Sequence, residues 1–130
     1  MAKANLTKMT NHTEQRQYFR LSYKTKVAMP TFRVQSKEFK VSEISEQGMR
    51  VIVRDTSLFS PNDTVEGEIL LNAFDTNIPV KGKVLRTVGN EVIFLLSEGL
   101  SFKEMIGEQR YMRKHHPNVF PKNSQLIENK

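Results

Sequence analysis

The chain has 130 residues, with 20 Lys and Arg against 14 Asp and Glu, and it contains no cysteine. This length fits one domain with a single hydrophobic core, and the lack of cysteine excludes a disulfide framework and thiolate metal sites. The net charge of +6 favours anionic partners such as nucleic acid, a nucleotide or a membrane surface. No stretch approaches the ~20 apolar residues of a membrane-spanning helix, and the N-terminal segment lacks the apolar centre of a secretory signal. We therefore expect a soluble, cytoplasmic protein.

The polar composition of residues 1–14 predicts a flexible N-terminal tail. Residues 15–117 form the predicted domain, and the polar residues 118–130 predict a flexible C-terminal tail. Within the domain, apolar and polar residues begin to alternate at Tyr18, which predicts a half-buried strand that continues to Val27.

The middle of the chain predicts further short strands separated by polar or glycine-containing turns. These strands are expected at 32–34, 39–44, 49–54, 65–71, 78–85 and 91–96. The Gly89–Asn90 pair between the last two is a strong hairpin signal.

The pattern changes to helical spacing after the last strand. Apolar or long side chains recur three or four residues apart at Phe102, Met105, Ile106, Gln109 and Met112. Ser101 and Glu104 have the spacing of a capping box at the helix start, and Pro117 marks its end. Six or seven strands followed by one helix predict a mainly β fold, a small antiparallel barrel with the helix against one opening. Side chains fill a barrel of this size, so a ligand must bind on its outside or rim.

No catalytic motif is present, neither a nucleophile elbow nor a phosphate-binding loop. The three histidines are His12, in the predicted tail, and the neighbours His115 and His116, which point about 100° apart on a helix and cannot readily share one metal ion. The carboxylates fall on predicted strand exteriors and loops, where we expect them to be solvated. The chain is therefore expected to be neither an enzyme nor a metalloprotein.

Arginines offer a more informative pattern. Arg16 and Arg20 stand four residues apart at the junction between the tail and the first predicted strand. A guanidinium is always charged, pairs with phosphate through a planar fork of donors, and stacks on a purine. The spacing alone is weak evidence, because Arg50 and Arg54 repeat it at a place where an exposed strand face explains it.

A second pattern is the segment from Glu43 through Ser45 to Gly48. Serine at a strand end, followed by glycine three residues later, predicts a tight turn in which glycine supplies a conformation that other residues resist. Such a turn leaves backbone N–H groups and a hydroxyl free for a ligand. A purely structural hairpin turn is the alternative.

In combination, the two patterns resemble the signature of the PilZ family, which is an Arg-x-x-x-Arg followed about two dozen residues later by Asp/Asn-x-Ser-x-x-Gly. The similarity covers roughly residues 15–117, including the last strand and the helix that carries Met105 to Tyr111. This resemblance implies a six-stranded antiparallel barrel that binds the bacterial second messenger cyclic di-GMP on its outer surface, without a cofactor.

The resemblance also implies roles for individual residues. Arg16 and Arg20 would contact phosphate and guanine, Glu43 a guanine edge, and Ser45 phosphate or guanine, while Gly48 would allow close approach of the backbone. Glu43 departs from the usual Asp or Asn, and its extra methylene predicts weakened binding or an adjusted side chain. Gln15, where some members have arginine, leaves open whether one ligand or a stacked pair is bound.

The expected mechanism is ordering of the Arg16 segment over the ligand, which creates a surface for a downstream protein. Since 130 residues leave no room for an output domain, we expect an adaptor, either monomeric or dimeric, in motility, adhesion or biofilm control. Two alternatives remain: a PilZ-like scaffold that binds a protein but no nucleotide, and a small basic barrel that binds RNA or single-stranded DNA. The aromatic residues, which fall mostly on buried strand positions, argue against nucleic acid.

Overall fold

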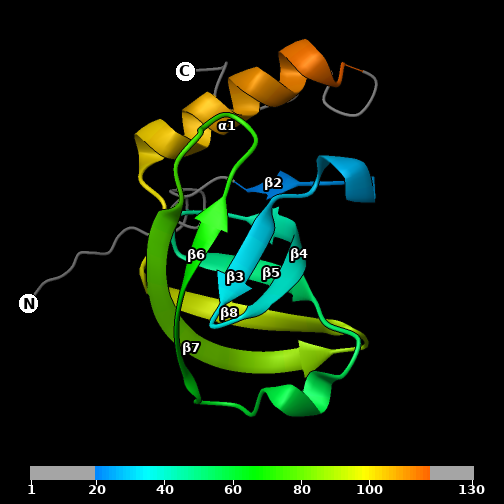
Figure 1. The fold of residues 1–130 in the computed structure, drawn as a ribbon, viewed down its shortest axis with the longest axis vertical. Coiled ribbons are helices and arrows are strands. Elements are labelled where there is room, and N and C mark those ends of the chain that lie inside the picture. The colour runs from blue at the N-terminus through cyan, green and yellow to red at the C-terminus, as the bar shows by residue number, and fades with distance from the viewer. Residues whose placement is uncertain (1–19, 118–130) are drawn as a thin grey trace, which may run out of the picture.

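The computed structural model describes residues 20–117, and this part of the chain forms seven strands, two short 3₁₀ helices and one α-helix (Figure 1). The strands are β2 (Leu21–Ser22), β3 (Thr31–Val34), β4 (Lys37–Ile44), β5 (Gly48–Ile52), β6 (Thr64–Leu70), β7 (Ile78–Val88) and β8 (Glu91–Glu98). The helices are η2 (Lys26–Ala28), η3 (Thr56–Leu58) and α1 (Phe102–His115). The two predicted tails lie outside the described residues, and so do His12 and Arg16.

Six of these strands close into a barrel. The ring runs β4–β3–β6–β7–β8–β5, and β5 pairs again with β4, so that every neighbouring pair is antiparallel. Because the ring is closed, each of its six strands has a hydrogen-bonded neighbour on both sides, and none is an edge strand. The predicted mainly β fold, a six-stranded antiparallel barrel with one C-terminal helix, is confirmed.

The strand predicted from Tyr18 to Val27 is wrong in its extent. Among the described residues, β2 has only two residues, outside the ring, and the chain then turns into η2, where Val27 is 82% exposed. The reason is competition for one edge of β4. The C-terminal end of β4 pairs with β2, but the Val41 amide N–H of β4 already donates to the carbonyl of Pro30, next to β3. A longer β2 would have no edge to pair with.

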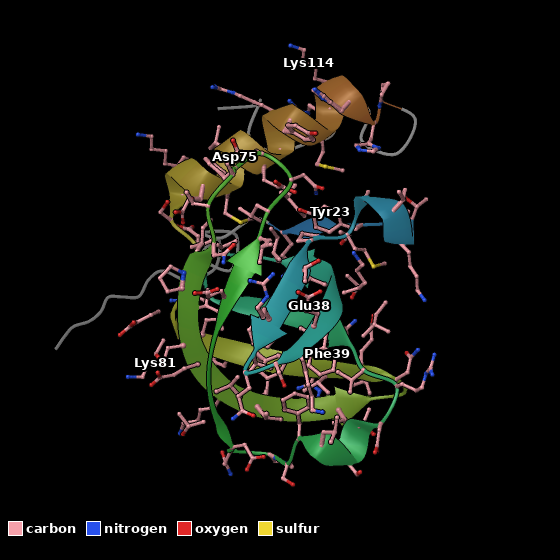
Figure 2. The ribbon with its side chains drawn as sticks, viewed as in Figure 1. Tyr23, Glu38, Phe39, Asp75, Lys81 and Lys114 are labelled. Carbon is pink, nitrogen blue, oxygen red and sulfur yellow. The ribbon has the colours of Figure 1, made fainter. Side chains whose placement is uncertain are left out.

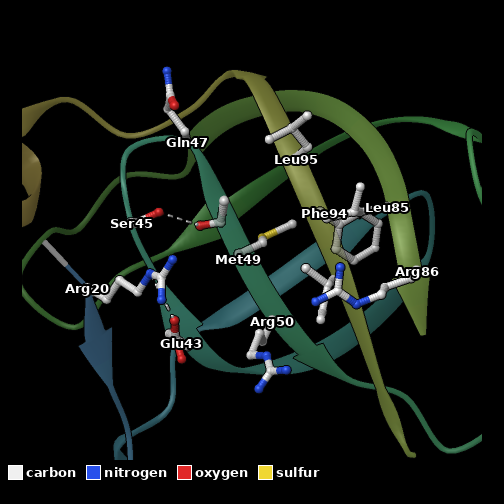
Figure 3. Close-up of a pocket in the computed structure, with 12 residues that line it drawn as sticks. Arg20, Glu43, Ser45, Gln47, Met49, Arg50, Leu85, Arg86, Phe94 and Leu95 are labelled. Atoms are coloured by element: carbon white, nitrogen blue, oxygen red, sulfur yellow. Dashed lines mark hydrogen bonds and ion pairs between the residues drawn. The ribbon is translucent and has the colours of Figure 1, made fainter. Parts of the chain in front are cut away.

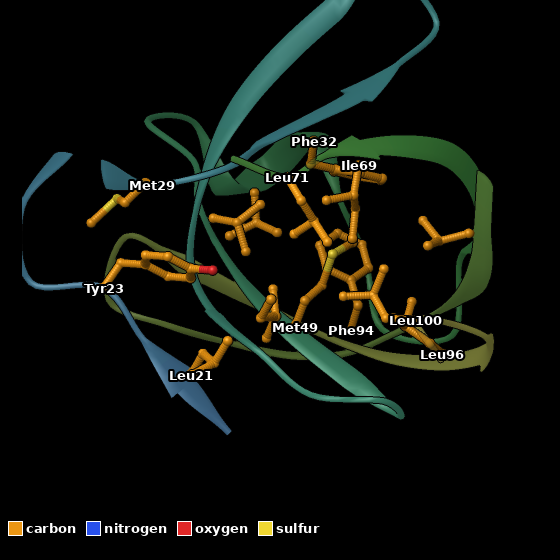
Figure 4. Close-up of a cluster of buried hydrophobic side chains, with 14 of the residues drawn as sticks. Leu21, Tyr23, Met29, Phe32, Met49, Ile69, Leu71, Phe94, Leu96 and Leu100 are labelled. Atoms are coloured by element: carbon orange, nitrogen blue, oxygen red, sulfur yellow. The ribbon is translucent and has the colours of Figure 1, made fainter. Parts of the chain in front are cut away.

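The barrel is filled by apolar side chains, as Figure 4 shows for strands β3, β5, β6 and β8. Phe32 and Phe94 lie at its centre with their ring centroids 5.6 Å apart, and Phe59 beside η3 packs edge-on against Phe94 at 5.5 Å. Full burial of one such ring stabilises the fold by roughly 1.5–3 kcal/mol. The filled interior leaves the outer surface and the rims for a ligand.

Helix α1 lies across one end of the barrel (Figure 1). Its predicted capping box is present, because the Ser101 hydroxyl accepts from the Glu104 amide at 3.0 Å and the Glu104 carboxylate accepts from the Ser101 amide at 2.8 Å. Met105 and Met112 are fully buried against the barrel, whereas Phe102, predicted for this face, is 55% exposed because it precedes the buried stripe. No helix within residues 20–117 is long and apolar enough to cross a membrane.

One carboxylate contradicts the expectation that all of them are solvated. Glu108 is completely buried under α1 and accepts hydrogen bonds from the Tyr23 hydroxyl at 2.8 Å, the Asn72 amide group at 2.7 Å and the Ala73 backbone at 2.9 Å. Figure 2 shows Tyr23 between the barrel and α1. Burial, and then the nearby Glu108 carboxylate, raise the pKa of Tyr23 well above its usual 10. The chain that follows β2 is thus attached to the helix.

A bulge in β4 determines which way Glu43 points. Val41 pairs with Val51 and Glu43 with Arg50, so Ser42 is an extra residue relative to β5. In an unbroken strand, Val41 and Glu43 would face the same side. The bulge leaves Val41 fully buried while Glu43 lies on the outer face.

A bulge in β7 has the same effect on Arg86. Val84 pairs with Phe94 and Arg86 with Ile93, so Leu85 is an extra residue relative to β8. Val84 is buried, whereas Leu85 and Arg86 are both exposed. Without the extra residue, the alternation from Ile78 to Val84 would direct Arg86 into the core.

Candidate ligand-binding site

A hollow of about 450 Å³ lies on the outer face of β4, β5, β8 and β7, near the start of β2 (Figure 3). Four of the five residues predicted for the site line it: Arg20, Glu43, Ser45 and Gly48. The fifth, Arg16, lies outside the described residues. The fold therefore brings Arg20 of the first pattern to the second pattern, although the two are more than twenty residues apart in the chain.

Arg20 is placed by the pairing of β2 with β4. Leu21 pairs with Ile44 and Ser22 with Glu43, so the same register sets Arg20 opposite Ser45. The Arg20 Nε lies 3.5 Å from a carboxylate oxygen of Glu43. Because the Arg20 side chain is 71% exposed, this ion pair stabilises the fold by at most about 1 kcal/mol. It orients the guanidinium and leaves it accessible.

The turn between β4 and β5 differs in detail from its prediction. The Ser45 amide N–H is not free, since it donates to the Gly48 carbonyl at 2.9 Å, and the Ser45 hydroxyl makes a long contact of 3.4 Å with the same oxygen. Gly48 does not have a positive φ angle. Glycine is favoured here for a different reason: a Cβ atom at this position would lie 3.2 Å from the Phe94 carbonyl oxygen of β8, which is a tight contact.

Arg50 also lines the hollow, although the sequence had assigned it to an ordinary exposed strand face. Its Nη1 lies 3.5 Å from Glu91, whose other carboxylate oxygen accepts from the Ser42 hydroxyl at 2.8 Å. The bulge residue Ser42 thus helps to hold Arg50. Arg54, its partner in the repeated spacing, follows β5 and does not line the hollow.

On the side of the hollow that belongs to β7 and β8, the lining consists of Arg86 and apolar side chains. Leu85 and Leu95 are 46% and 52% exposed, which is unusual for leucine, and Ile93 lies between Arg50 and Arg86 in the strand register. No local pattern in the sequence marked these residues, because they meet only through the pairing of β5, β8 and β7.

The chemistry of this hollow suits a planar anion. Its guanidinium groups provide forked donors for phosphate and flat faces for aromatic bases. The exposed leucines provide an apolar surface, and Glu43 provides an acceptor for amide-type donors such as those of guanine. Among residues 20–117, no group of three or more His, Asp or Glu side chains could hold a metal ion.

The family model of the PilZ domain matches residues 14–114, and the chain belongs to this family. Solved structures with the same fold include the following two. The Bacillus subtilis inhibitor of motility MotI/DgrA has a TM-score of 0.52 and 17% identity, over 76% of this chain and 50% of that one, so the chain spans about half of its length. The Legionella uncharacterized protein Lpg0364 has a TM-score of 0.51 and 16% identity, over 74% of this chain and 98% of that one. No curated protein matches the chain.

Proposed function

We propose that this protein is a receptor for cyclic di-GMP that passes the signal on by contact with a downstream protein. The observation that carries the proposal is the meeting of Arg20, Glu43, Ser45 and Gly48 around one hollow on the barrel's outer face. Membership of the PilZ family supports the choice of ligand, since these residues stand at the positions of the family's binding motif.

Each side chain has a role in this proposal. Arg20 pairs with a phosphate or stacks on a guanine, and Glu43 accepts hydrogen bonds from guanine N1–H and N2–H. The guanine then competes with Arg20 for the carboxylate, and the phosphate replaces the carboxylate as the partner of Arg20. Ser45 donates its hydroxyl, whose present hydrogen bond is long and easily exchanged.

The proposed signal begins at the chain that leads into β2. Arg16 closes over the bound ligand, and the segment that carries it becomes ordered there. The Tyr23 hydroxyl, directly after β2, is hydrogen-bonded to Glu108 of α1, so the chain on the other side of β2 is attached to the helix. The downstream protein recognises the surface that the ordered segment and the ligand form together.

An RNA-binding barrel fits the surface less well. Single-stranded nucleic acid needs several exposed aromatic rings for stacking. Among the described residues, Phe102 is the one aromatic side chain that is largely exposed, and it lies on α1, away from the hollow. A scaffold without a nucleotide ligand is distinguished by titration with cyclic di-GMP alone.

The test is isothermal titration calorimetry with cyclic di-GMP on the full chain and on three arginine variants. Arg16→Ala and Arg20→Ala are each expected to weaken binding by about 10-fold to 100-fold, because each removes a charge-assisted contact with the ligand. Arg54→Ala is the matched control, since Arg54 is exposed and outside the hollow, and it should bind like the wild type. Circular dichroism checks that all variants remain folded.

Absence of binding by the wild-type protein would refute the proposed ligand. If the wild-type protein binds cyclic di-GMP and both Arg16→Ala and Arg20→Ala bind it with the same affinity, the ligand lies elsewhere on the barrel.

A further inference from the structure

Arg86 is a positive charge on the opposite side of the hollow from Arg20 (Figure 3). It is exposed, and within residues 20–117 no carboxylate forms an ion pair with it. In this it differs from Arg20 and Arg50, which pair with Glu43 and Glu91. An arginine that lines a hollow without such a partner keeps all its donors available for an anion.

The strand geometry, and not only the residue type, places Arg86 there. The extra residue Leu85 reverses the inward and outward alternation of β7, and this change brings Arg86 to the outer face beside Ile93. The bulge at Ser42 does the same for Glu43 on β4. Bulges are common beside functional sites, where they redirect a side chain. Here two bulges direct two charged groups to the two sides of one hollow.

The surface next to Arg86 is apolar. Leu85 and Leu95 are exposed and also line a second hollow of about 360 Å³ that extends along β7 and β8. Exposed leucines beside an unpaired guanidinium suit a flat base on the apolar surface and a phosphate at the cation. The side that carries Arg20 and Glu43 also has a partner for each part of a nucleotide, in this case a hydrogen-bond acceptor for the base and a cation for the phosphate.

We infer that Arg86 is a further ligand-contacting arginine, beyond Arg16 and Arg20, and that it makes the site selective for a cyclic dinucleotide over a mononucleotide. This inference rests on the proposed function. Strands β4 and β7 are three strand spacings apart, about 14 Å along the sheet. A mononucleotide reaches one side of the hollow, whereas a ligand with two bases and two phosphates contacts both sides at once.

The experiment compares two ligands on the full chain, cyclic di-GMP by calorimetry and GMP by chemical-shift titration of the backbone amides, which detects weak binding. Arg86→Ala is expected to lower the affinity for cyclic di-GMP at least about tenfold and the affinity for GMP less than about twofold. Arg86→Lys keeps the charge without the planar fork, and it should recover part of the loss. Arg54→Ala is again the control and should change neither affinity.

The outcomes separate this inference from the proposed function. If Arg20→Ala loses cyclic di-GMP while Arg86→Ala binds it like the wild type, Arg86 is no ligand contact and the proposed function stands. An equal loss for GMP and cyclic di-GMP in Arg86→Ala would overturn the selectivity. Failure of the wild-type protein to bind cyclic di-GMP would overturn both proposals. Because Arg86 is exposed, its variants should unfold at the wild-type urea concentration, which excludes a general loss of structure.

Discussion

Glu108 of α1 has no surface exposed to solvent. Its carboxylate lies against the loop after β6 and the chain that follows β2. Its two carboxylate oxygens accept from three donors, among them the Tyr23 hydroxyl. A buried carboxylate is tolerated only when its hydrogen-bonding capacity is used in this way. The residue therefore holds together parts of the fold that are far apart in sequence, one of which leads directly from the candidate site.

We expect Tyr23→Phe to test this arrangement through its pH dependence. The raised pKa means that the folded protein keeps the Tyr23 proton at pH values where the unfolded chain, with a pKa near 10, has lost it. Stability from this group is therefore fully present below about pH 10 and is lost as the pH rises further. At pH 8, Tyr23→Phe should lower the free energy of unfolding by about 1–3 kcal/mol, because Glu108 loses a donor.

The measurement is the urea midpoint of both proteins at pH 8 and at pH 11. The difference between wild type and Tyr23→Phe should shrink at pH 11, since only the wild type loses the contribution of the Tyr23 hydroxyl. A difference that stays constant would mean that the hydroxyl is not protected by burial.

At the level of elements, the hairpin of β4 and β5 supplies three of the candidate ligand contacts, and at Gly48 it packs tightly against β8. A Cβ atom at Gly48 would be crowded, because the nearest atom is a backbone oxygen of β8, which cannot move by even a few tenths of an ångström without shifting that strand. Gly89, in the hairpin of β7 and β8, is different. It has a φ of 61° and open space around its Cβ position.

These two glycines allow a paired prediction. Gly48→Ala should destabilise the protein by about 1 kcal/mol through crowding and should also weaken cyclic di-GMP binding, because β5 and β8 form the floor of the hollow. Gly89→Ala should cost a similar amount through its left-handed backbone and leave binding unchanged. Urea unfolding and calorimetry measure the two effects. Equal ligand affinities in the two variants would contradict the placement of Gly48 at the site.

For the whole molecule, the candidate site draws on strands that belong to one closed ring, so ligand binding should stabilise the entire barrel. At a cyclic di-GMP concentration 100 times Kd, the expected stabilisation is about 2.7 kcal/mol. For a domain of this size, that corresponds to a rise in Tm of at least about 10 °C. Differential scanning calorimetry should show a single shifted transition, with a much smaller shift for GMP at the same concentration. An unchanged Tm would argue against a site that spans the ring.

Much of this fold could be predicted from local patterns in the sequence. The alternation from Ile78 to Val84 predicted most of β7, the Gly89–Asn90 pair its hairpin, and the spacing of Ser101 and Glu104 the start of α1. These features depend on neighbours in the chain.

The remaining features depend on partners distant in sequence. The length of β2 is set by β3 on the shared edge of β4, and the positions of Arg50 and Arg86 are set by strand pairing. A bulge is defined against a partner strand, so alternation within one strand cannot show it. Glu108 did have a detectable signal, because it lies three residues from Met105 and four from Met112 on the buried face of the helix.

The β7 bulge has a consequence for comparing this chain with its relatives. Leu85 contributes no charge, yet its presence determines that Arg86 faces the solvent. A relative that lacks this extra residue before the corresponding arginine of β7 would direct that arginine into the barrel, or lose it from this face. In an alignment, a single gap at Leu85 therefore indicates a changed binding site, even where every residue of the PilZ signature is identical. Strand length should be read together with residue identity when the site is traced through the family.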